Sequence, residues 1–256
     1  MLSHFCGSIA LIFLPILLIQ IPNVNQTLTV GFCCYPMTNK KPIGILGGTF
    51  NPIHHGHLRL ALELYEQLDL AQVRLLPSAH PPHREQPSVS SQRRLEMVQA
   101  AIAGVKGLNL DDRELRRQGP SYMVDTLSSL RDDYPHQPLC LILGMDAFMD
   151  LPHWHQWEQL LTLAHLLVVR RPETAMPQGQ FMQDFLKAHQ ANCFEELRKQ
   201  SSGAIWMEKI PALAISATQI RHLIAASKNP RYLLPLAVLD IINTHQLYRN
   251  RIMYGH

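Results

Sequence analysis

From about residue 40 onward, short apolar runs alternate with amphipathic stretches. Three runs of strand length lie at Ile43–Leu46, Val73–Leu76 and Leu108–Leu110, and two more form the centres of "PLCLILG" and "HLLVVRRP". Short apolar runs separated by helical stretches are typical of buried parallel strands. The pattern therefore predicts a Rossmann-like α/β fold, with a doubly wound, mainly parallel sheet and helices on both faces.

Apolar residues at spacings of three and four positions predict the helices between these strands. The first helix begins near Leu58, the second near Ser91 and the third near Ser121. Ser90 or Ser91 can cap the second helix, because a serine hydroxyl accepts a hydrogen bond from a free N–H of the first turn. The residues assigned to the three apolar faces are Leu58, Ala61, Leu62, Tyr65 and Leu68; Leu95, Val98 and Ile102; and Met123, Leu127 and Leu130.

The last third of the chain is less regular. Residues 172–203 are polar and helix-prone, and we interpret them as an insertion. After "IWMEKI", two helical segments at about 217–226 and 235–244 predict a small helical C-terminal segment.

The first 36 residues do not share this pattern. The apolar run Ile9–Ile19 contains Pro15 and is too short to cross a bilayer. No Lys or Arg precedes it and no clean cleavage site follows, although a targeting segment stays open as an interpretation. Met37 lies six residues before the first strand. We therefore expect an N-terminal extension over 1–36, arising from a wrongly assigned start or forming a poorly ordered tail, and a functional domain over 37–256.

Composition narrows the classes of partner and compartment. The chain has 256 residues, 46% of them hydrophobic, and a formal net charge of +3. Without a run of Lys or Arg, this small excess gives little support for nucleic-acid binding, and a membrane partner is not expected. Five cysteines without a CxxC pair indicate free thiols in a reducing compartment, which favours the cytoplasm. A homo-oligomer is compatible with the sequence, which does not specify one.

The stretch "IGILGGTFNPIHHGHL" combines a buried strand, a glycine pair and three histidines before a helix. Gly47 and Gly48 allow the backbone to approach a ligand closely, and the following helix directs free N–H groups at it. His54 and His57 are spaced so that both reach one side of the first helical turn, where imidazoles can donate hydrogen bonds to phosphate. GxxxxGK[ST] and GxGxxG are both absent. The turn therefore predicts a phosphate site of another type.

Two other interpretations of this turn stay open at this point. A glycine pair at the end of a strand is often only a turn, and a lone histidine is often a surface or core residue. Alternatively, His54, His55 and His57 could bind zinc in a hydrolase. That site would also need an acidic or Cys ligand, and the adjacent His54 and His55 cannot easily face one metal from a helix.

Longer motifs resemble one enzyme family. "GGTFNPIHHGH" resembles the HxGH signature of nucleotidyltransferases related to class I aminoacyl-tRNA synthetases, and "ISATQIR" resembles their ISSTxIR element. Between them, "PPHR", "PSYMVDTL", "LGMDAFMDLPHWHQW" and "VVRRP" resemble bacterial nicotinate-mononucleotide adenylyltransferases, in order and along almost all of residues 40–249. Phosphopantetheine adenylyltransferase and cytidylyltransferases are alternatives within the superfamily, but they are usually shorter and do not account for the Trp154 region. An inactive nucleotide-binding protein is a further alternative.

The resemblance implies transfer of AMP from ATP to nicotinate mononucleotide, giving deamido-NAD and pyrophosphate in NAD biosynthesis. The family uses Mg²⁺ and forms no covalent intermediate, and the mononucleotide phosphate attacks the α-phosphorus in line. It therefore implies ATP and nicotinate mononucleotide as small-molecule partners and Mg²⁺ as cofactor, with no metal held by protein side chains alone.

Carried onto matching positions, the resemblance implies that His54, His57 and Arg221 are the catalytic residues. The two histidines would contact the ATP phosphates, with His57 nearest the reacting centre, and Arg221 would hold the β- and γ-phosphates. The implied ATP site comprises Gly47, Gly48, Thr49, Phe50, Gly144, Asp146, Arg170, Arg171, Ser216 and Thr218.

For the acceptor, the resemblance implies that Trp154 stacks on the nicotinate ring and that the N–H of His155 reads its carboxylate. His83 and Arg84 would lie close to the acceptor phosphate, and Met123 close to the pyridine ring. Simpler roles exist for several site residues: Trp154 as core, Asp146 as a helix cap, and Arg221 as a surface residue of a capped helix.

The chain departs from the family pattern at three positions. Asn51 stands where many members have Asp, which removes a negative charge beside the phosphates. Met123 replaces the usual Thr near the pyridine ring, and Ala217 replaces the second Ser of ISSTxIR. If the missing Thr hydroxyl reads the carboxylate, we expect weaker discrimination against the amide mononucleotide.

Overall fold

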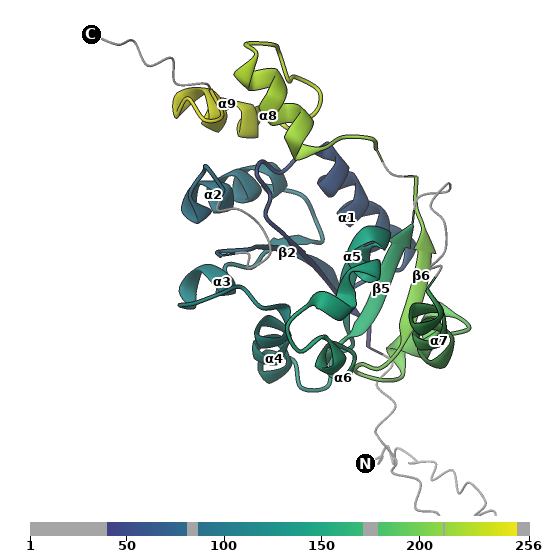
Figure 1. The fold of residues 1–256 in the computed structure, drawn as a ribbon. Helices are drawn as coiled ribbons and strands as arrows, with labels where there is room; N and C mark the ends of the chain where they lie inside the picture. The colour runs from purple at the N-terminus through teal and green to yellow at the C-terminus, as the bar shows by residue number, and fades with distance from the viewer. Residues whose placement is uncertain (1–39, 81–86, 171–178, 212, 250–256) are drawn as a thin grey trace, which may run out of the picture. The chain divides into compact units, whose positions relative to one another are not determined.

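A six-stranded parallel sheet forms the centre of the computed structural model, which describes residues 40–80, 87–170, 179–211 and 213–249 (Figure 1). The five strands predicted from apolar runs are confirmed, and "IWMEK" adds the sixth. The strands are β1 (Ile43–Gly48), β2 (Gln72–Pro77), β3 (Leu108–Leu110), β4 (Leu139–Gly144), β5 (His165–Arg170) and β6 (Ile205–Lys209).

The strand order is β3-β2-β1-β4-β5-β6. The chain therefore adds β2 and β3 on one side of β1, and then β4, β5 and β6 on the other side. β1 pairs in parallel with β2 and also with β4, where Ile43 lies opposite Leu139. The direction of winding reverses between β1 and β4. Ligands of open α/β sheets bind outside the carboxyl ends of the strands at such a point. The fold thus places the glycine–histidine turn, which follows β1, at the expected position.

Helices follow the strands in alternation. The second predicted helix begins at Ser91, and Ser90 is its cap, since its hydroxyl accepts a hydrogen bond from the Arg93 N–H. The first helix begins at His55, three residues before the predicted start, and the third begins at Met123 rather than Ser121. The bounds are α1 (His55–Gln67), α2 (Ser91–Ile102), α3 (Arg113–Arg116), α4 (Met123–Asp133), α5 (Met145–Met149), α6 (Leu160–Leu163), α7 (Gln180–His189), α8 (Ala217–Ala225) and α9 (Leu236–Thr244), with 3-10 turns at Leu151–His153, Trp157–Gln159 and Phe194–Arg198.

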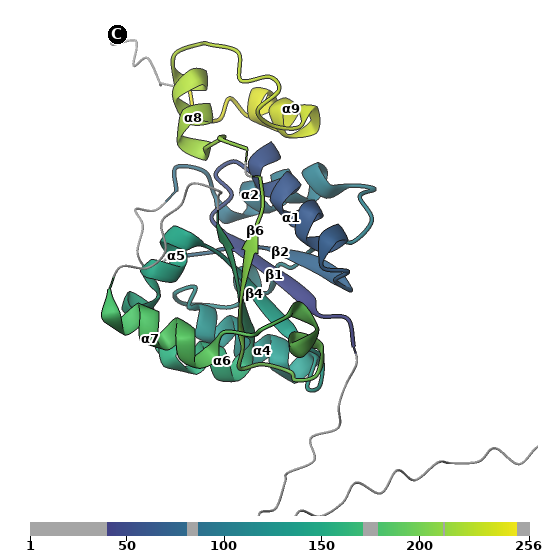
Figure 2. The ribbon, with the colours of Figure 1, turned by 90° about the vertical axis from the view of Figure 1, so that its right-hand side faces the viewer.

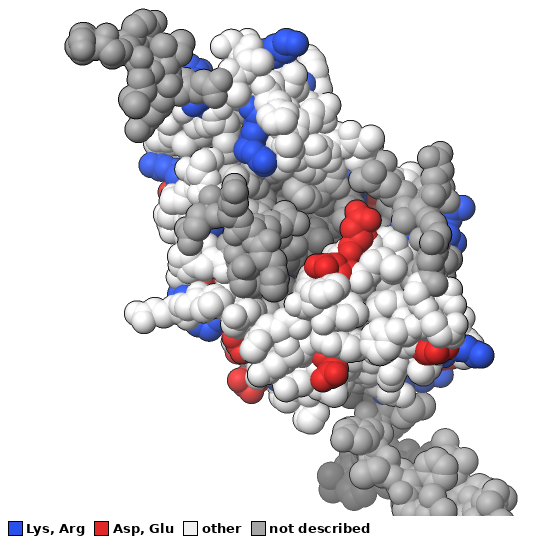
Figure 3. All heavy atoms as spheres, viewed as in Figure 1, with Lys and Arg blue, Asp and Glu red and all other residues white. Residues whose placement is uncertain are grey.

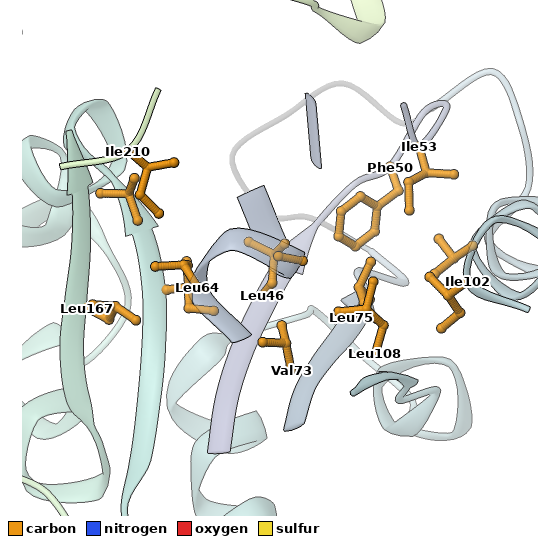
Figure 4. Packing of buried hydrophobic residues seen from close by; sticks show 14 of the residues in the cluster. Leu46, Phe50, Ile53, Leu64, Val73, Leu75, Ile102, Leu108, Leu167 and Ile210 are labelled. Atoms are coloured by element: carbon orange, nitrogen blue, oxygen red, sulfur yellow. The ribbon is translucent and has the colours of Figure 1, made fainter. Parts of the chain in front are cut away.

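Two hydrophobic clusters bury the two faces of the sheet, because side chains alternate along each strand. On β4, for example, Leu141 belongs to the cluster that includes residues of α4, α5 and α7, whereas Ile142 belongs to the cluster that includes residues of α1 and α2. Figure 2 shows α1 and α2 on one side of the sheet and α4, α6 and α7 on the other. Figure 4 shows the α1 side, where Leu46, Leu64 and Leu75 meet and Phe50 and Ile53 extend the core to the end of β1. The prediction of a sheet covered on both faces is confirmed.

Two helix faces differ from the prediction. On α1, Leu64 is fully buried, whereas Leu62 is only partly buried, because the face follows Ala61, Leu64 and Leu68. On α2, Arg94 is buried and 1% exposed, whereas its neighbour Leu95 is partly exposed. A charged residue therefore occupies a core position that an apolar pattern does not indicate.

The interpretation of residues 172–203 as an insertion is wrong for its described part. Residues 179–203 form the connection from β5 to β6, and α7 contributes Met182 and Leu186 to the core beside the sheet. Phe194 and Leu197, in the 3-10 turn that follows, are buried in the other cluster.

The predicted extension over 1–36 lies outside the described residues, and its boundary with the domain over 37–256 stays a prediction. Within the described ranges, none of the helices combines the length and apolar character needed to span a bilayer.

Candidate active site

The chain makes a sharp turn between β1 and α1. Phe50 adopts a left-handed conformation with φ of 45°, the Asn51–Pro52 peptide is cis, and His54 is the extended N-cap residue of α1. Phe50 and Ile53 are buried, so the turn is fixed to the core on both sides of Asn51. The predicted strand-to-helix turn is confirmed, and its backbone N–H groups lie at the start of a 13-residue helix.

His54 and His57 stack face to face, with ring centroids 3.7 Å apart and an angle of 22° between the planes. The edge of Phe50 packs against His57 at 5.1 Å. Burial lowers the pKa of His54 to about 4, with a smaller contribution from His55. Burial, and secondarily His54, lowers the pKa of His57 to about 3. Both imidazoles are therefore neutral at pH 7 in the ligand-free site, where they serve as hydrogen-bond donors without positive charge.

The Nδ1 atoms of His54 and His57 are buried and have no hydrogen-bond partner among the described residues. A neutral imidazole carries one proton, and placing it on Nε2 leaves only a lone pair at the buried edge. Each ring then presents its N–H on the side away from that edge. Two unpaired donors side by side suit a ligand that is rich in acceptor oxygens.

Gly56 allows this stacked pair to sit against the first turn of α1. A Cβ atom at Gly56 would lie 3.0 Å from both Cε1 and Nδ1 of His54, and 3.5 Å from the carbonyl oxygen of Ile215. Glycine is therefore favoured at position 56 on steric grounds, which the sequence motif alone does not reveal. The same contact shows that "HHGH" and "ISATQIR" meet in space.

Arg221 makes the second connection between these motifs. Its Nη1 donates to the carbonyl oxygen of Asn51 at 2.9 Å, and its Nη2 donates to the Thr218 hydroxyl at 3.1 Å. The Asn51 side chain is also held, because the Tyr248 hydroxyl donates to its Oδ1 at 2.7 Å. Ser216 is the N-cap of α8 and accepts from the Gln219 N–H. The capped helix is thus confirmed, but Arg221 is fixed against the turn and is not a free surface residue.

Arg94, on α2, also holds the turn. The sequence pattern did not indicate this residue. Its Nη1 donates to the Thr49 carbonyl oxygen at 2.7 Å. The signal that could have indicated it is a second arginine in the first turn of an otherwise amphipathic helix, directly after Arg93. Gly47 and Gly48, which complete the predicted phosphate loop with Thr49 and Phe50, are the last residues of β1.

On the other side of the winding reversal, Gly144 ends β4 and Asp146 lies in the first turn of α5. Gly144 is the N-cap position and no side chain caps this helix, so the interpretation of Asp146 as a helix cap is wrong. Asp146 is exposed, and a Cβ at Gly144 would meet nothing within 4 Å. Arg170 ends β5. Figure 3 shows Asp and Glu side chains over α5 and Lys and Arg side chains over α8, on either side of a recessed area.

The proposed acceptor residues lie around the start of α4 and the turns after α5. Trp154 is partly buried and packs on the α4 side of the core. His155 is exposed and stacks on Tyr122 with ring centroids 4.1 Å apart, a partner that the sequence did not reveal. Met123 contacts the end of β1, since a Cβ at Gly47 would lie 2.9 Å from its Cε atom. The structure therefore brings Met123 and the predicted phosphate loop together.

Three predicted site residues, His83, Arg84 and Arg171, lie outside the described residues. Among the residues that are described, no three His, Cys, Asp or Glu side chains gather closely enough to hold a metal ion. His54 and His57 present stacked faces to each other.

The family model and the most similar relatives agree on one enzyme family. A cytidylyltransferase-like family model matches residues 45–223. The chain is 48% identical over 213 residues to a probable nicotinate-nucleotide adenylyltransferase of Pseudomonas syringae pv. tomato, covering 83% of this chain and 96% of that protein. It is 45% identical over 210 residues to a protein of the same name from Aeromonas salmonicida, covering 82% of this chain and 98% of the relative.

Structure comparison supports the same fold. A Plasmodium falciparum nicotinic acid mononucleotide adenylyltransferase complexed with NaAD superposes with a TM-score of 0.63 at 18% identity, covering 81% of this chain and 97% of that one. The same enzyme complexed with APC gives a TM-score of 0.61. At this level of identity, the likeness bears on the fold alone.

Proposed function

The chain belongs to the nicotinate-nucleotide adenylyltransferases within the cytidylyltransferase-like family, and from this premise we propose that its site transfers AMP from ATP to nicotinate mononucleotide. An oxygen of the mononucleotide phosphate attacks the α-phosphorus, a new P–O bond forms, and the bond to the β-phosphate oxygen breaks. The products are deamido-NAD and pyrophosphate, and the enzyme acts in NAD biosynthesis. The observation that carries this proposal is the meeting of His54, His57 and Arg221 around the turn after β1.

The ATP phosphates would lie against this turn. His54 and His57 donate hydrogen bonds as neutral imidazoles, and the negative charge of bound triphosphate then favours their protonated form. Arg221 uses two of its N–H groups on Asn51 and Thr218, which leaves others for the β- and γ-phosphates. The turn and α8 thus hold the triphosphate from opposite sides.

The remaining ATP contacts extend along the carboxyl edge of the sheet. The backbone of Gly47, Gly48, Thr49 and Phe50 surrounds the phosphates, Ser216 and Thr218 close the site from α8, and Gly144 and Asp146 hold the adenosine ribose. Arg170 and Arg171 flank the nucleotide. Mg²⁺, bound with the triphosphate, would neutralise part of its charge when present. We propose the cytoplasm as the location, because the substrates suit it and the two cysteines within the described residues, Cys140 and Cys193, are free.

The acceptor would occupy the side of the site near α4. Trp154 offers an aromatic face to the nicotinate ring, and His155, held against Tyr122, can donate to the ring carboxylate. His83 and Arg84 supply positive charge for the acceptor phosphate. Met123, the first residue of α4, is partly buried and contacts Gly47.

The test is pyrophosphate release by the purified protein with Mg-ATP and one acceptor at a time. Nicotinate mononucleotide, nicotinamide mononucleotide and phosphopantetheine serve as parallel acceptors. We expect release with the first to exceed the others. Release mainly with phosphopantetheine would contradict the assigned acceptor. ATP binding without release with any acceptor would contradict the enzymatic function and leave a nucleotide-binding protein.

A further inference from the structure

Arg94 is a buried charge that holds only backbone oxygens. Its Nη1 donates to Thr49 at 2.7 Å, its Nη2 to Ala79 at 3.3 Å and its Nε to Val89 at 3.4 Å, each time at the carbonyl oxygen. The residue is 1% exposed and is among the largest fully buried side chains of the described chain. A buried guanidinium is retained only where its N–H groups find acceptors, since its desolvation is costly.

The three acceptors belong to two different loops at the carboxyl edge of the sheet. Thr49 lies in the turn between β1 and α1, which holds the predicted ATP phosphate contacts. Ala79 and Val89 lie at the two described ends of the connection between β2 and α2. One side chain on α2 therefore links the ATP turn to both ends of the neighbouring loop.

Other contacts place that neighbouring loop beside the acceptor region. The Ser78 N–H donates to the Gly48 carbonyl oxygen at 2.9 Å, so the two loops are adjacent. The Ser121 hydroxyl accepts from the N–H groups of Ala79 and His80, both at 3.0 Å. Ser121 comes two residues before Met123, the first residue of α4. The loop held by Arg94 is therefore also fixed to the helix start where the acceptor is proposed to bind.

Glu114 is a second buried charged residue close to Arg94. It is 3% exposed and receives a hydrogen bond from the Thr126 hydroxyl at 2.8 Å. Burial lowers the pKa of the Arg94 guanidinium, and the nearby Tyr248 and Glu114 oppose this shift. The three backbone acceptors fix Arg94 in one orientation, which a residue that aligns two loops requires.

We propose that Arg94 is a positioning residue that fixes the ATP turn relative to the described ends, residues 78–80 and 87–90, of the loop between β2 and α2. The inference rests on the proposed function, in which two anionic substrates must meet in line. In such a reaction each substrate can bind to its own loop, while the rate depends on the relative position of the two loops. Loss of Arg94 is therefore expected to lower kcat while the affinity for each substrate alone is retained.

The experiment compares Arg94→Met, Arg94→Lys and Arg131→Met with the unchanged protein. Arg131 is the matched control, because it is a partly buried arginine that donates to the carbonyl oxygens of Tyr134, Gln137, Leu163 and Ser201 at the opposite edge of the sheet. Initial rates give kcat and both KM values per folded molecule, and thermal unfolding gives Tm. Hydrogen exchange measures the amides of residues 47–51 and 78–80.

We expect Arg94→Met to lower kcat about 100-fold with both KM values changed less than about threefold. Lysine should restore part of the rate, since it retains charge and donors without the planar fork. Amide exchange should become faster in both loops together. Arg131→Met should lower Tm about as much as Arg94→Met does. It should leave kcat and the exchange rates of the amides at 47–51 and 78–80 unchanged.

Two results would overturn the inference: an Arg94→Met kcat within threefold of the unchanged protein, or exchange that is unaltered in either loop. If Arg94→Met does not fold, Arg94→Lys decides by the same two measurements. An unchanged protein that releases no pyrophosphate contradicts the proposed function alone, because the exchange measurement still reports whether Arg94 joins the loops.

Discussion

Arg221 on α8 donates a hydrogen bond to the carbonyl oxygen of Asn51, at 2.9 Å and across 170 residues of sequence. The bond joins the C-terminal helices to the turn after β1. The Thr218 hydroxyl accepts from the second terminal nitrogen, so the guanidinium is held at both ends. A single side chain thus connects the two sequence motifs that are farthest apart in the site, and its replacement tests whether their meeting serves the reaction.

Arg221→Met should lower kcat/KM for ATP about 100-fold, because the developing charge on the leaving pyrophosphate loses a donor. Arg221→Lys should lose less, since the charge remains but the planar fork does not. Steady-state pyrophosphate release measures both. Arg59→Met is the control, because Arg59 lies exposed on α1 and its ion pair among the described residues is with Glu63, one turn away. Equal activity in Arg221→Met and Arg59→Met would contradict the role of Arg221.

Gly56→Ala separates the geometry of the histidine pair from the stability of the helix. A Cβ atom 3.0 Å from two atoms of the His54 ring should displace that ring from its stack with His57. We expect kcat to fall about 10- to 100-fold from this misplacement. Stability should be kept or raised, since Ala is favoured over Gly inside a helix by about 1 kcal/mol.

The control for this variant is Gly179→Ala, at the N-cap of α7, where an added Cβ meets nothing within 4 Å. It should leave kcat unchanged. A Gly56→Ala protein with lowered Tm and unchanged kcat per folded molecule would show that the glycine serves folding rather than the site.

The sequence was sufficient for much of the fold because its periodicity is local. Apolar runs located five strands, and the glycine–histidine turn followed from β1 and α1 alone. The contacts of Arg94 and Tyr248 were not accessible, because they depend on loops that meet only in the folded chain. The neutral state of His54 and His57 was missed for a related reason: burial, which lowers their pKa values, is a property of the packed site.

The titration of His57 tests that neutral state directly. Burial disfavours the charged imidazole and lowers its pKa to about 3, so its ring proton signals should not shift between pH 5.5 and 8 in the ligand-free protein. Bound triphosphate has the opposite effect, because negative charge favours the protonated ring. Adding Mg-ATP should therefore move the midpoint upward. Proton NMR of the histidine rings, assigned with His57→Asn, measures both, and a free-protein midpoint near 6.5 would contradict the burial argument.

Met123→Thr tests whether this position sets the choice between acid and amide acceptors. The Met123 side chain contacts Gly47 and lacks the hydroxyl that the family resemblance implies at this position. A site that hydrogen-bonds a substrate group discriminates more strongly than an apolar one. We expect the ratio of kcat/KM for nicotinate over nicotinamide mononucleotide to rise about tenfold in Met123→Thr. Met149→Thr, an exposed change on α5, is the control, and an unaltered ratio in Met123→Thr would reject the hypothesis.

We predict that the protein loses stability in acid because His165 is buried as a neutral ring. This effect is separate from catalysis. His165 is fully buried, its Nδ1 accepts from the Ala204 N–H at 3.1 Å, and its Nε2 donates to the Gln200 carbonyl oxygen at 3.0 Å. Both nitrogens are thus satisfied in the neutral ring, and burial lowers the pKa to about 4. The unfolded chain, with an ordinary histidine pKa, binds a proton first as the pH falls. The stabilisation is therefore complete above about pH 6.5 and is lost between pH 6.5 and 4.

Urea unfolding at pH 6.5 and pH 5 measures this loss. One such histidine accounts for about 1.5 kcal/mol over that interval, because each pH unit contributes about 1.4 kcal/mol once the unfolded histidine is protonated, and at pH 6.5 it is only half protonated. In His165→Gln, the unfolding free energy should change less between pH 6.5 and pH 5, by that amount. This difference does not depend on how far the substitution lowers stability at neutral pH. His136→Gln, an exposed change, should keep the full dependence. Since the pKa values of His54 and His57 are also lowered, a residual loss in His165→Gln is expected, and an undiminished one would exclude His165 as a source.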